Sequence, residues 1–212
     1  ELLTFEYEHV NIDALKKLKA EGLVIYPDPA ILEIVQDKGV QKEFYRRHHI
    51  PTADFRLIAD KAALKANEDF LPAMQKTRKA GYDGKGVLKM ASRSDLADAF
   101  NEPSILERFI DFKKEIAVIV ARNINGETVL YPTVEMVFHP VKNLVEFLQS
   151  PANITEDVNK EARRIALLLA DQLQLAGVLA VEMFVTGDDK VLVNAIAPRV
   201  HNSGHHSIEG SC

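Results

Sequence analysis

A carboxylate stands in the middle of an apolar, β-branched stretch near the end of the chain. Glu182 lies in the run 178–185, whose composition predicts a strand. Burying this carboxylate without a partner would cost on the order of several kcal/mol, so a cation or a metal ion is expected beside it. Alternation along the strand places it on one face with Ala180 and Phe184. The competing interpretation is an edge strand whose Glu182 lies in water beside a polar loop.

A second strand is expected at 190–197, after a turn that contains Gly187. If this hairpin closes, Asn194 lies on the strand that faces Glu182. Directly after it comes a loop rich in hydrogen-bonding groups, which include Arg199, His201, Asn202, Ser203 and His205. Such a set within a few residues fits a small phosphorylated or carboxylated ligand. A zinc site built from the histidines of this loop lacks a Cys ligand or an H-E-x-x-H helix, which disfavours it.

A glycine-rich segment with basic neighbours lies near the middle of the chain. It reads Gly81, Tyr82, Asp83, Gly84, Lys85 and Gly86. Glycines let backbone N–H groups approach phosphate oxygens, and Lys76 and Lys85 add positive charge. The spacing matches neither the P-loop nor the dinucleotide-binding fingerprint. A flexible turn between two strands explains the segment equally well.

One lysine and two carboxylates stand at the ends of apolar strands. Lys76 lies among apolar neighbours in the expected strand 72–78, so it is either a snorkelling edge residue or a phosphate ligand. Glu107 ends one apolar strand and Glu115 begins another, with Phe109 and Ile110 between them. A short apolar hinge of this kind can receive an adenine base and hold ribose hydroxyls. It can equally be a turn between strands whose carboxylates are solvated.

The elements that must position these residues fall into two groups. Over residues 2–48 the order is β-α-β-α, which is typical of the end of an open α/β sheet, with a boundary near residue 36. From Phe55 onward the pattern is α+β with mainly antiparallel strands, and Asn125-Gly126 predicts a hairpin. Strands are expected at 55–58, 72–78, 87–90, 105–110, 116–123 and 128–136, and helices at 61–67, 92–100 and from Thr155 to the residue before Gly177.

The bulk composition excludes several classes of protein. The chain has 212 residues, a net charge of −5, and 47% apolar and 27% charged residues, which is ordinary for a globular protein. The negative charge argues against a general nucleic-acid-binding or anionic-membrane surface. A single cysteine, Cys212, excludes an internal disulfide framework, and no run reaches the roughly 18 apolar residues of a membrane span. A cytoplasmic protein is therefore expected. Because the chain begins with Glu1 and stops just after a dense polar motif, we expect the middle of a longer protein.

Taken together and in this order, the motifs resemble those of the ATP-grasp 5-(carboxyamino)imidazole ribonucleotide synthases of purine biosynthesis. The segments 4–10 and 36–38 also look like that family, so the resemblance covers essentially the whole chain. It implies an α+β protein with the ATP-grasp fold, made of two α+β subdomains and preceded by the tail of an α/β pre-ATP domain. The implied parts are 1–36 for that tail, 37–110 for the N-terminal lid subdomain, and 111–212 for the C-terminal subdomain with the metal and substrate site. The motifs that carry the resemblance are Lys76-Thr77-Arg78, Gly81–Gly86, Glu107 to Ile110 with Glu115, Val181 to Val185, and Asn194 to His205.

The resemblance also implies a reaction. ATP, bicarbonate and 5-aminoimidazole ribonucleotide would give the carboxyamino product, ADP and phosphate through carboxyphosphate, in a homodimeric enzyme that uses Mg²⁺. Lys38 and Lys76 would contact the ATP phosphates, and Glu182 would be a Mg²⁺ ligand. The ATP site would comprise Lys38, Lys76, Gly81, Tyr82, Asp83, Gly84, Lys85, Gly86, Val87, Glu107, Arg108, Phe109, Ile110, Glu115, Asn194 and Ala195. The imidazole nucleotide and bicarbonate would lie against Tyr82, Asp83, Arg199, His201, Asn202 and Ser203, with Arg199 and Asp83 as catalytic residues.

One departure from the family pattern bears on activity. The family has Glu after the Asn of the last strand, where this chain has Ala195, and that Glu is the second metal-binding carboxylate. Two alternatives to the synthase therefore stay open. One is an ATP-grasp ligase that acts on another substrate, and the other is a nucleotide-binding module without turnover.

Overall fold

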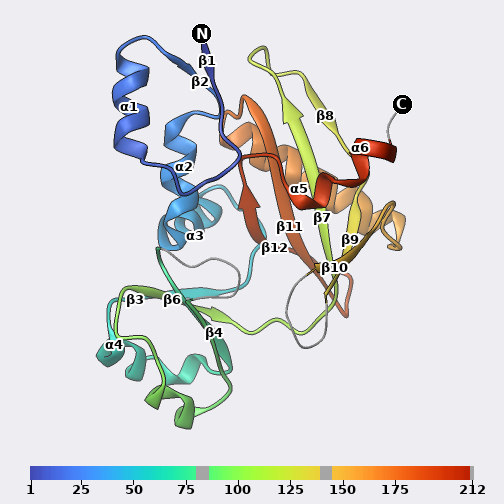
Figure 1. The fold of residues 1–212 in the computed structure, drawn as a ribbon. Helices are drawn as coiled ribbons and strands as arrows, with labels where there is room; N and C mark the ends of the chain where they lie inside the picture. The colour runs from blue at the N-terminus through green and yellow to red at the C-terminus, as the bar shows by residue number, and fades with distance from the viewer. Residues whose placement is uncertain (80–85, 139–144, 211–212) are drawn as a thin grey trace.

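The computed structural model describes residues 1–79, 86–138 and 145–210 (Figure 1). Figure 1 shows an N-terminal helical part, a small sheet below it, and a large sheet with a long helix behind it. The expected glycine-rich residues 81–85 lie outside the described residues. Among the described helices, none combines the length and the apolar character needed to cross a bilayer.

The N-terminal part pairs two short parallel strands and packs helices beside them. The first two helices each begin at a capping side chain. Asn11 caps α1 and Asp28 caps α2, each by accepting a backbone N–H at 2.9 Å. Pro29 is the first residue of α2, where its missing N–H is not needed. The elements are β1 (Leu2–Leu3), α1 (Ile12–Ala20), β2 (Val24–Ile25), α2 (Pro29–Gln36) and α3 (Lys38–Arg47).

The small sheet is antiparallel and has four strands in the order β3-β6-β4-β5. Short helices cover it and form a core with it around Ile58, Phe70 and Leu106. The backbone N–H of Thr77 donates to the carbonyl of Gly86 at 2.8 Å, so the two ends of the glycine-rich segment are held together. The elements are β3 (Phe55–Ile58), α4 (Lys61–Lys65), the 3-10 helix η1 (Glu68–Phe70), β4 (Ala73–Thr77), β5 (Val87–Met90), the 3-10 helix η2 (Arg93–Ala97) and β6 (Ser104–Arg108).

The large sheet is also antiparallel, with the order β10-β9-β7-β11-β12 and with β8 beside β7. The long helix α5 packs on one face of this sheet (Figure 1). The elements are β7 (Phe112–Arg122), β8 (Thr128–Leu130), β9 (Val134–Phe138), β10 (Val145–Gln149), α5 (Glu156–Gln172), β11 (Gly177–Thr186), β12 (Val191–Ala197), the 3-10 helix η3 (Asn202–Gly204) and α6 (His206–Gly210).

Strand β11 is internal to the large sheet, and its side chains point alternately to the two faces of that sheet. Val181, Met183 and Val185 are fully buried in the core that α5 closes. Because side chains alternate along a strand, Glu182 belongs to the opposite face. The hairpin of β11 and β12 and the turn at Asn125-Gly126 are both confirmed.

Two expected details are wrong, and one strand was not expected. The expected strand 128–136 is divided into β8 and β9, because Pro132 between them has no N–H for the ladder. The register changes there, so that β7 pairs Val120 with Leu130 but Ala117 with Val134. The expected helix 92–100 is only η2, a short 3-10 helix. The sequence analysis also missed β10, a short edge strand beside β9.

Candidate functional site

Two carboxylates lie close together on the face of the large sheet that is opposite α5. Glu182 of β11 pairs with Ala117, and Glu115 of β7 pairs with Phe184, so the two glutamates are diagonal neighbours on the same face. Burial and the nearby charge of Glu182 raise the pKa of Glu115 to about 7. Burial also raises the pKa of Glu182. For both carboxylates burial thus outweighs the nearby positive charge, which is Lys76 for Glu115 and Arg199 for Glu182.

A β-bulge in the neighbouring strand aims a third polar group at this pair. Glu182 pairs with Ala195 while Met183 pairs with Val193, so Asn194 is an extra residue on β12. A bulge of this kind redirects a side chain, and the Asn194 amide donates to Oε1 of Glu115 at 3.3 Å. Ala195 is left directly opposite Glu182.

These groups fit Mg²⁺ bound together with a phosphate. Mg²⁺ prefers oxygen ligands and takes one or two carboxylates, with phosphate oxygens and water completing the shell. Glu115 and Glu182 supply two such carboxylates. Within residues 1–79, 86–138 and 145–210, no group of three or more His, Cys, Asp or Glu side chains could hold a metal by itself. The described histidines therefore give no support to a zinc site, whereas a metal that shares a phosphate suits the carboxylate pair.

His201 touches Glu182 from the loop after β12. Its Nε2 lies 3.3 Å from Oε1 of Glu182, and its Nδ1 receives the backbone N–H of Ser203 at 3.3 Å. A ring nitrogen that accepts an N–H carries no proton itself, so a neutral ring has its proton on Nε2, facing Glu182. Burial and the Arg199 charge lower the pKa of His201 to about 4, so the ring is neutral at pH 7. The Nε2 side of the neutral His201 ring thus faces Glu182.

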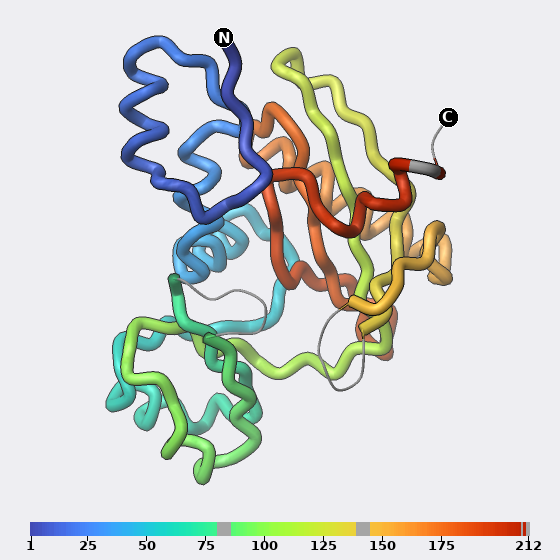
Figure 2. Tube along the Cα trace, viewed as in Figure 1, coloured from blue at the N-terminus to red at the C-terminus, as the bar shows by residue number. Residues whose placement is uncertain are grey.

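Arg199, predicted to bind an anion, is engaged by the first part of the chain. Its guanidinium makes a two-pronged contact with Glu8, with the second bond at 3.1 Å. Burial alone would raise the pKa of Glu8, but the hydrogen bond and charge of Arg199 hold it below its usual range. Figure 2 shows the C-terminal segment passing alongside the N-terminal segment that carries Glu8. The positive charge of Arg199 is thus neutralised by Glu8.

A buried cluster of lysines around one carboxylate lies at the small sheet. Glu107 of β6 is 5% exposed and binds Lys42 through Oε1 and Lys76 through Oε2. Burial alone would raise the pKa of Glu107, but the two lysines outweigh it and lower the value. Burial and the nearby Lys76 also lower the pKa of Lys38. We call Lys38, Lys42, Lys76 and Glu107 the lysine cluster.

The lysine cluster and the carboxylate pair act on each other electrostatically. The charge of Lys76 works to lower the pKa of Glu115, against the effect of burial and of Glu182. Both Glu107 and Glu182 contribute to the raised pKa of Tyr45, after burial. The fold therefore brings a positive cluster from the small sheet near a negative pair on the large sheet.

Three of the alternative interpretations from sequence are wrong. Glu182 is not on an edge strand in water, because β11 lies between β7 and β12. Lys76 is not an edge residue, because β4 lies between β6 and β5. Glu107 is not solvated, because two ammonium groups replace water around it.

The other expected site residues lie along the same region. Lys38 is the first residue of α3, Gly86 and Val87 lie at the start of β5, and Arg108 ends β6. Phe109 and Ile110 form the connection from β6 to β7, and Asn202 and Ser203 lie in η3. Gly81, Tyr82, Asp83, Gly84 and Lys85 lie outside the described residues, as does any contact they make.

Sequence reasoning missed Glu8, Lys42 and Thr52. Each interacts with a residue far away in the chain, and no local spacing shows such a contact. Lys42 gave one usable signal. It lies one turn after Lys38 on a helix whose neighbouring Phe44 and Tyr45 are buried in the core.

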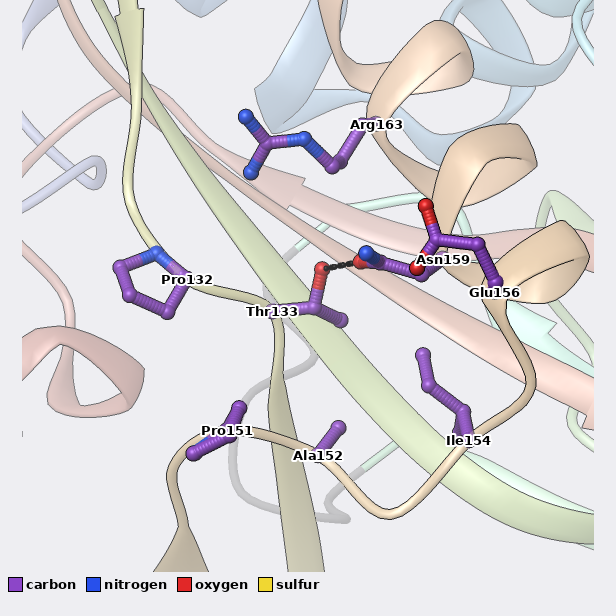
Figure 3. Close-up of a pocket in the computed structure, with 8 residues that line it drawn as sticks. All are labelled: Pro132, Thr133, Pro151, Ala152, Ile154, Glu156, Asn159 and Arg163. Atoms are coloured by element: carbon purple, nitrogen blue, oxygen red, sulfur yellow. Dashed lines mark hydrogen bonds between the residues drawn. The ribbon is translucent and has the colours of Figure 1, made fainter.

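The cavity drawn in Figure 3 is separate from these clusters. It has a volume of about 260 Å³. It lies between α5, the residues just before β9 and the residues just after β10. Thr133 donates its hydroxyl to Asn159 of α5 across it at 2.7 Å (Figure 3). Because α5 covers the face opposite Glu182, none of the predicted site residues lines this cavity.

Comparison with known proteins assigns the chain to a family of enzymes. The ATP-grasp domain model matches residues 43–212. The chain is 37% identical over 215 residues to the N5-carboxyaminoimidazole ribonucleotide synthase of Bacillus subtilis, which covers 99% of this chain and 56% of that protein. The chain thus spans little more than half the length of that relative.

Two solved structures are similar to the whole fold. The N5-carboxyaminoimidazole ribonucleotide synthetase of Thermotoga maritima has a TM-score of 0.86 and 41% identity, over 97% of this chain and 53% of that one. The N5-carboxyaminoimidazole synthase of Aspergillus clavatus, in complex with ADP and 5-aminoimidazole ribonucleotide, has a TM-score of 0.88 and 33% identity. That similarity covers 98% of this chain and 55% of the other.

Proposed function

The chain belongs to the ATP-grasp family, and from this premise we propose that it carries out the ATP-dependent carboxylation of 5-aminoimidazole ribonucleotide. Bicarbonate and ATP are the co-substrates, and the products are 5-(carboxyamino)imidazole ribonucleotide, ADP and phosphate. The observation that carries the proposal is the meeting of the buried lysine cluster with the Glu115–Glu182 pair, since a metal-bound nucleotide phosphate needs both charges. The choice of substrate rests on the names of the most similar relatives.

The residues divide into a nucleotide side and a substrate side. Lys38 and Lys76 hold the ATP phosphates, with the segment 81–87 over them. The connection from Glu107 to Ile110 receives the adenine, and Glu115 and Asn194 border the ribose and the phosphates. Glu182 and Glu115 hold Mg²⁺, which supplies charge neutralisation as the terminal phosphoryl group leaves ATP.

The protein groups position and shield the reactants. An oxygen of bicarbonate attacks the γ-phosphorus of ATP, whose bond to the β–γ bridging oxygen breaks, so that carboxyphosphate and ADP form. The exocyclic amine of the imidazole nucleotide then takes up the carboxyl group, as phosphate leaves and the amine loses a proton. Arg199, His201, Asn202 and Ser203, together with Tyr82 and Asp83, receive these two substrates. For Arg199 to bind an anion, Glu8 must release it or share it. Excluding water protects carboxyphosphate from hydrolysis.

The larger organisation follows the same model. We take residues 1–36, 37–110 and 111–212 as the tail of the pre-ATP domain and the two ATP-grasp subdomains. The small sheet within 55–108 and the large sheet within 112–197 support this division. α3 contributes Phe44 and Tyr45 to the core of the large sheet, so residues 37–110 also pack against residues 111–212. A cytoplasmic homodimer follows from the family resemblance, and sedimentation of the purified protein tests the dimer.

A nucleotide-binding protein without turnover is the second candidate. The specific observation for it is Ala195, which lies directly opposite Glu182 where the family has a carboxylate. With one ligand missing, the nucleotide would still bind through the lysine cluster and the hinge. The reaction would then lack a firmly held metal.

The test is release of ADP by the purified protein with ATP, Mg²⁺ and bicarbonate. Addition of 5-aminoimidazole ribonucleotide is expected to stimulate ADP release, and an amino acid is expected to have no effect. Stimulation by an amino acid and not by the imidazole nucleotide would contradict the proposed substrate. ADP binding in calorimetry without any ADP release would instead support the second candidate.

A further inference from the structure

Lys42 lies where three parts of the fold meet. Lys42 is a residue of α3, and its side chain is 2% exposed. Its ammonium donates to both Thr52 and Glu107. Thr52 donates its own hydroxyl to the carbonyl of Val193 on β12 at 2.8 Å. One lysine therefore joins α3, the edge of the large sheet and β6 of the small sheet.

The carboxylate of Glu107 is divided between two lysines. Oε1 receives Lys42 and Oε2 receives Lys76. Two ammonium groups against one carboxylate leave one positive charge in excess. Lys76 is the more accessible of the two, with its side chain 16% exposed against 2% for Lys42. The excess charge is therefore presented on the Lys76 side, where Lys38 lies within electrostatic range.

From this geometry we infer that Lys42 is a positioning residue that keeps the Lys76 ammonium directed at the nucleotide phosphates. Lys42 does not touch the nucleotide, because it is enclosed between Thr52 and Glu107. It acts by occupying one oxygen of Glu107, so that Lys76 is held at the other oxygen and is not fully neutralised. The inference rests on the proposed function, since it requires that a nucleotide phosphate lies beside Lys76.

Loss of Lys42 has a definite electrostatic consequence. Both oxygens of Glu107 would then be available to Lys76 alone, and the Glu107–Lys76 ion pair would have no net charge. The ammonium would lie closer to Glu107 and would attract a phosphate less strongly. If Lys42 instead only fastens the three parts together, its loss would loosen the whole site, and the adenine hinge and the phosphate site would weaken alike.

Calorimetry with ADP and with adenosine separates the two roles. With Lys42→Met, the affinity for Mg²⁺-ADP is expected to fall about tenfold, the size of one charge-assisted contact, and the affinity for adenosine to stay unchanged. Lys16→Met is the matched control, because Lys16 also pairs with a glutamate, Glu33, but lies exposed on α1. An equal loss for ADP and adenosine, or no loss for ADP, overturns the inference.

A second change in the same cluster tests the electrostatic cause. In the double variant Lys42→Met with Glu107→Gln, Lys76 keeps its charge and faces a neutral amide. ADP affinity is expected to return to within about threefold of the wild type, since the excess positive charge is restored. This variant also serves if Lys42→Met alone fails to fold, because it keeps the net positive charge of the wild-type Lys42–Glu107–Lys76 group.

The two proposals fail in different ways. If the double variant binds adenosine normally but ADP at least about tenfold more weakly than the wild type, the positioning role is wrong and the proposed function stands. If the wild-type protein binds neither ADP nor adenosine, the proposed function is wrong and the role of Lys42 fails with it.

Discussion

The lysine cluster and the carboxylate pair differ in how their buried charges are compensated. In the lysine cluster, Glu107 lies between Lys42 and Lys76, so most of the charge is compensated within the protein. At the carboxylate pair, burial and the charge of Glu182 raise the pKa of Glu115 to about 7, and the neighbouring polar groups are the neutral Asn194 amide and the neutral His201 ring. Within the described residues the first site has a positive excess and the second a negative one.

The difference shows what each site needs from a ligand. A bound anion would reduce the repulsion among the ammonium groups of the lysine cluster. A bound cation would reduce the repulsion between Glu115 and Glu182, which is strong because little water reaches them. A nucleotide phosphate with its Mg²⁺ supplies both charges at once. The lysine cluster comes from α3 and the small sheet and the carboxylate pair from the large sheet, and the charge of Lys76 already reaches Glu115, so one ligand can contact both.

The largest expected effect comes from adding the missing charge to the carboxylate side. Ala195→Glu places a third carboxylate directly opposite Glu182. Turnover is expected to rise at least about a thousandfold, because a firmly held metal neutralises charge as the phosphoryl group leaves. Steady-state ADP release at saturating Mg²⁺ measures this.

Stability gives a second readout of the same change. Without Mg²⁺ the third carboxylate should lower the melting temperature, and Mg²⁺ with ADP should recover it, since like charges repel until a cation joins them. Ala195→Gln is the matched control, with similar size and no charge, and it should show neither effect. If the wild-type protein already turns over as fast as Ala195→Glu, the metal role given to position 195 is wrong.

The next effect in size concerns His201, whose Nε2 faces Glu182. His201→Phe removes the Nε2 proton that faces this carboxylate. Partners of metal ligands are typically worth about tenfold to a hundredfold in metal affinity, so the Mg²⁺ concentration that promotes ADP binding should rise by at least about tenfold. Calorimetry of ADP at a series of Mg²⁺ concentrations measures it. A change in the KM for the imidazole nucleotide without any change in the Mg²⁺ dependence would mean that His201 acts on the substrate side alone.

Much of this architecture was predictable from sequence, and the reason is local. The α+β class is confirmed, because alternation, caps and Asn-Gly turns act over short distances. The ATP-grasp fold, which the family resemblance implied, is confirmed as well. The hairpin of β11 and β12 and the place of Glu182 within it follow from the same rules. The division of 128–136 was missed although Pro132 is visible in the sequence, since a strongly apolar pattern outweighed a single proline.

The ion pairs were not predictable in the same way. Lys42 and Glu107 lie far apart in the chain and meet only after the small sheet docks on α3. Arg199 and Glu8 come from opposite ends of the described chain. Composition shows that such charges exist, but only tertiary packing decides which of them pair. The roles given to individual site residues therefore remain predictions.

The smallest expected effect tests a second link between α3 and the small sheet, outside both clusters. Asp37 caps α3 and makes a two-pronged ion pair with Arg78 at 2.8 Å, just before the glycine-rich segment. Burial alone would raise the pKa of Asp37, but the hydrogen bond and charge of Arg78 hold it below its usual range. Asp37→Asn keeps the cap, since Asn serves as well as Asp there, and removes only the ion pair. The free energy of unfolding at pH 7 is expected to fall by about 1 kcal/mol.

The pH dependence separates this ion pair from a general loss of packing. Because the pKa of Asp37 is lower in the folded chain than in the unfolded one, its stabilisation is fully present above the unfolded value of about 4. It is lost as the pH falls through the lower folded value. Urea unfolding of wild type and Asp37→Asn should therefore differ at pH 7 and converge in acid. A difference that stays constant down to about pH 3 would mean that packing around Arg78 is what the variant disturbs. ADP affinity at pH 7 should change little, because Asp37 caps the helix beside the lysine cluster without neutralising Lys76.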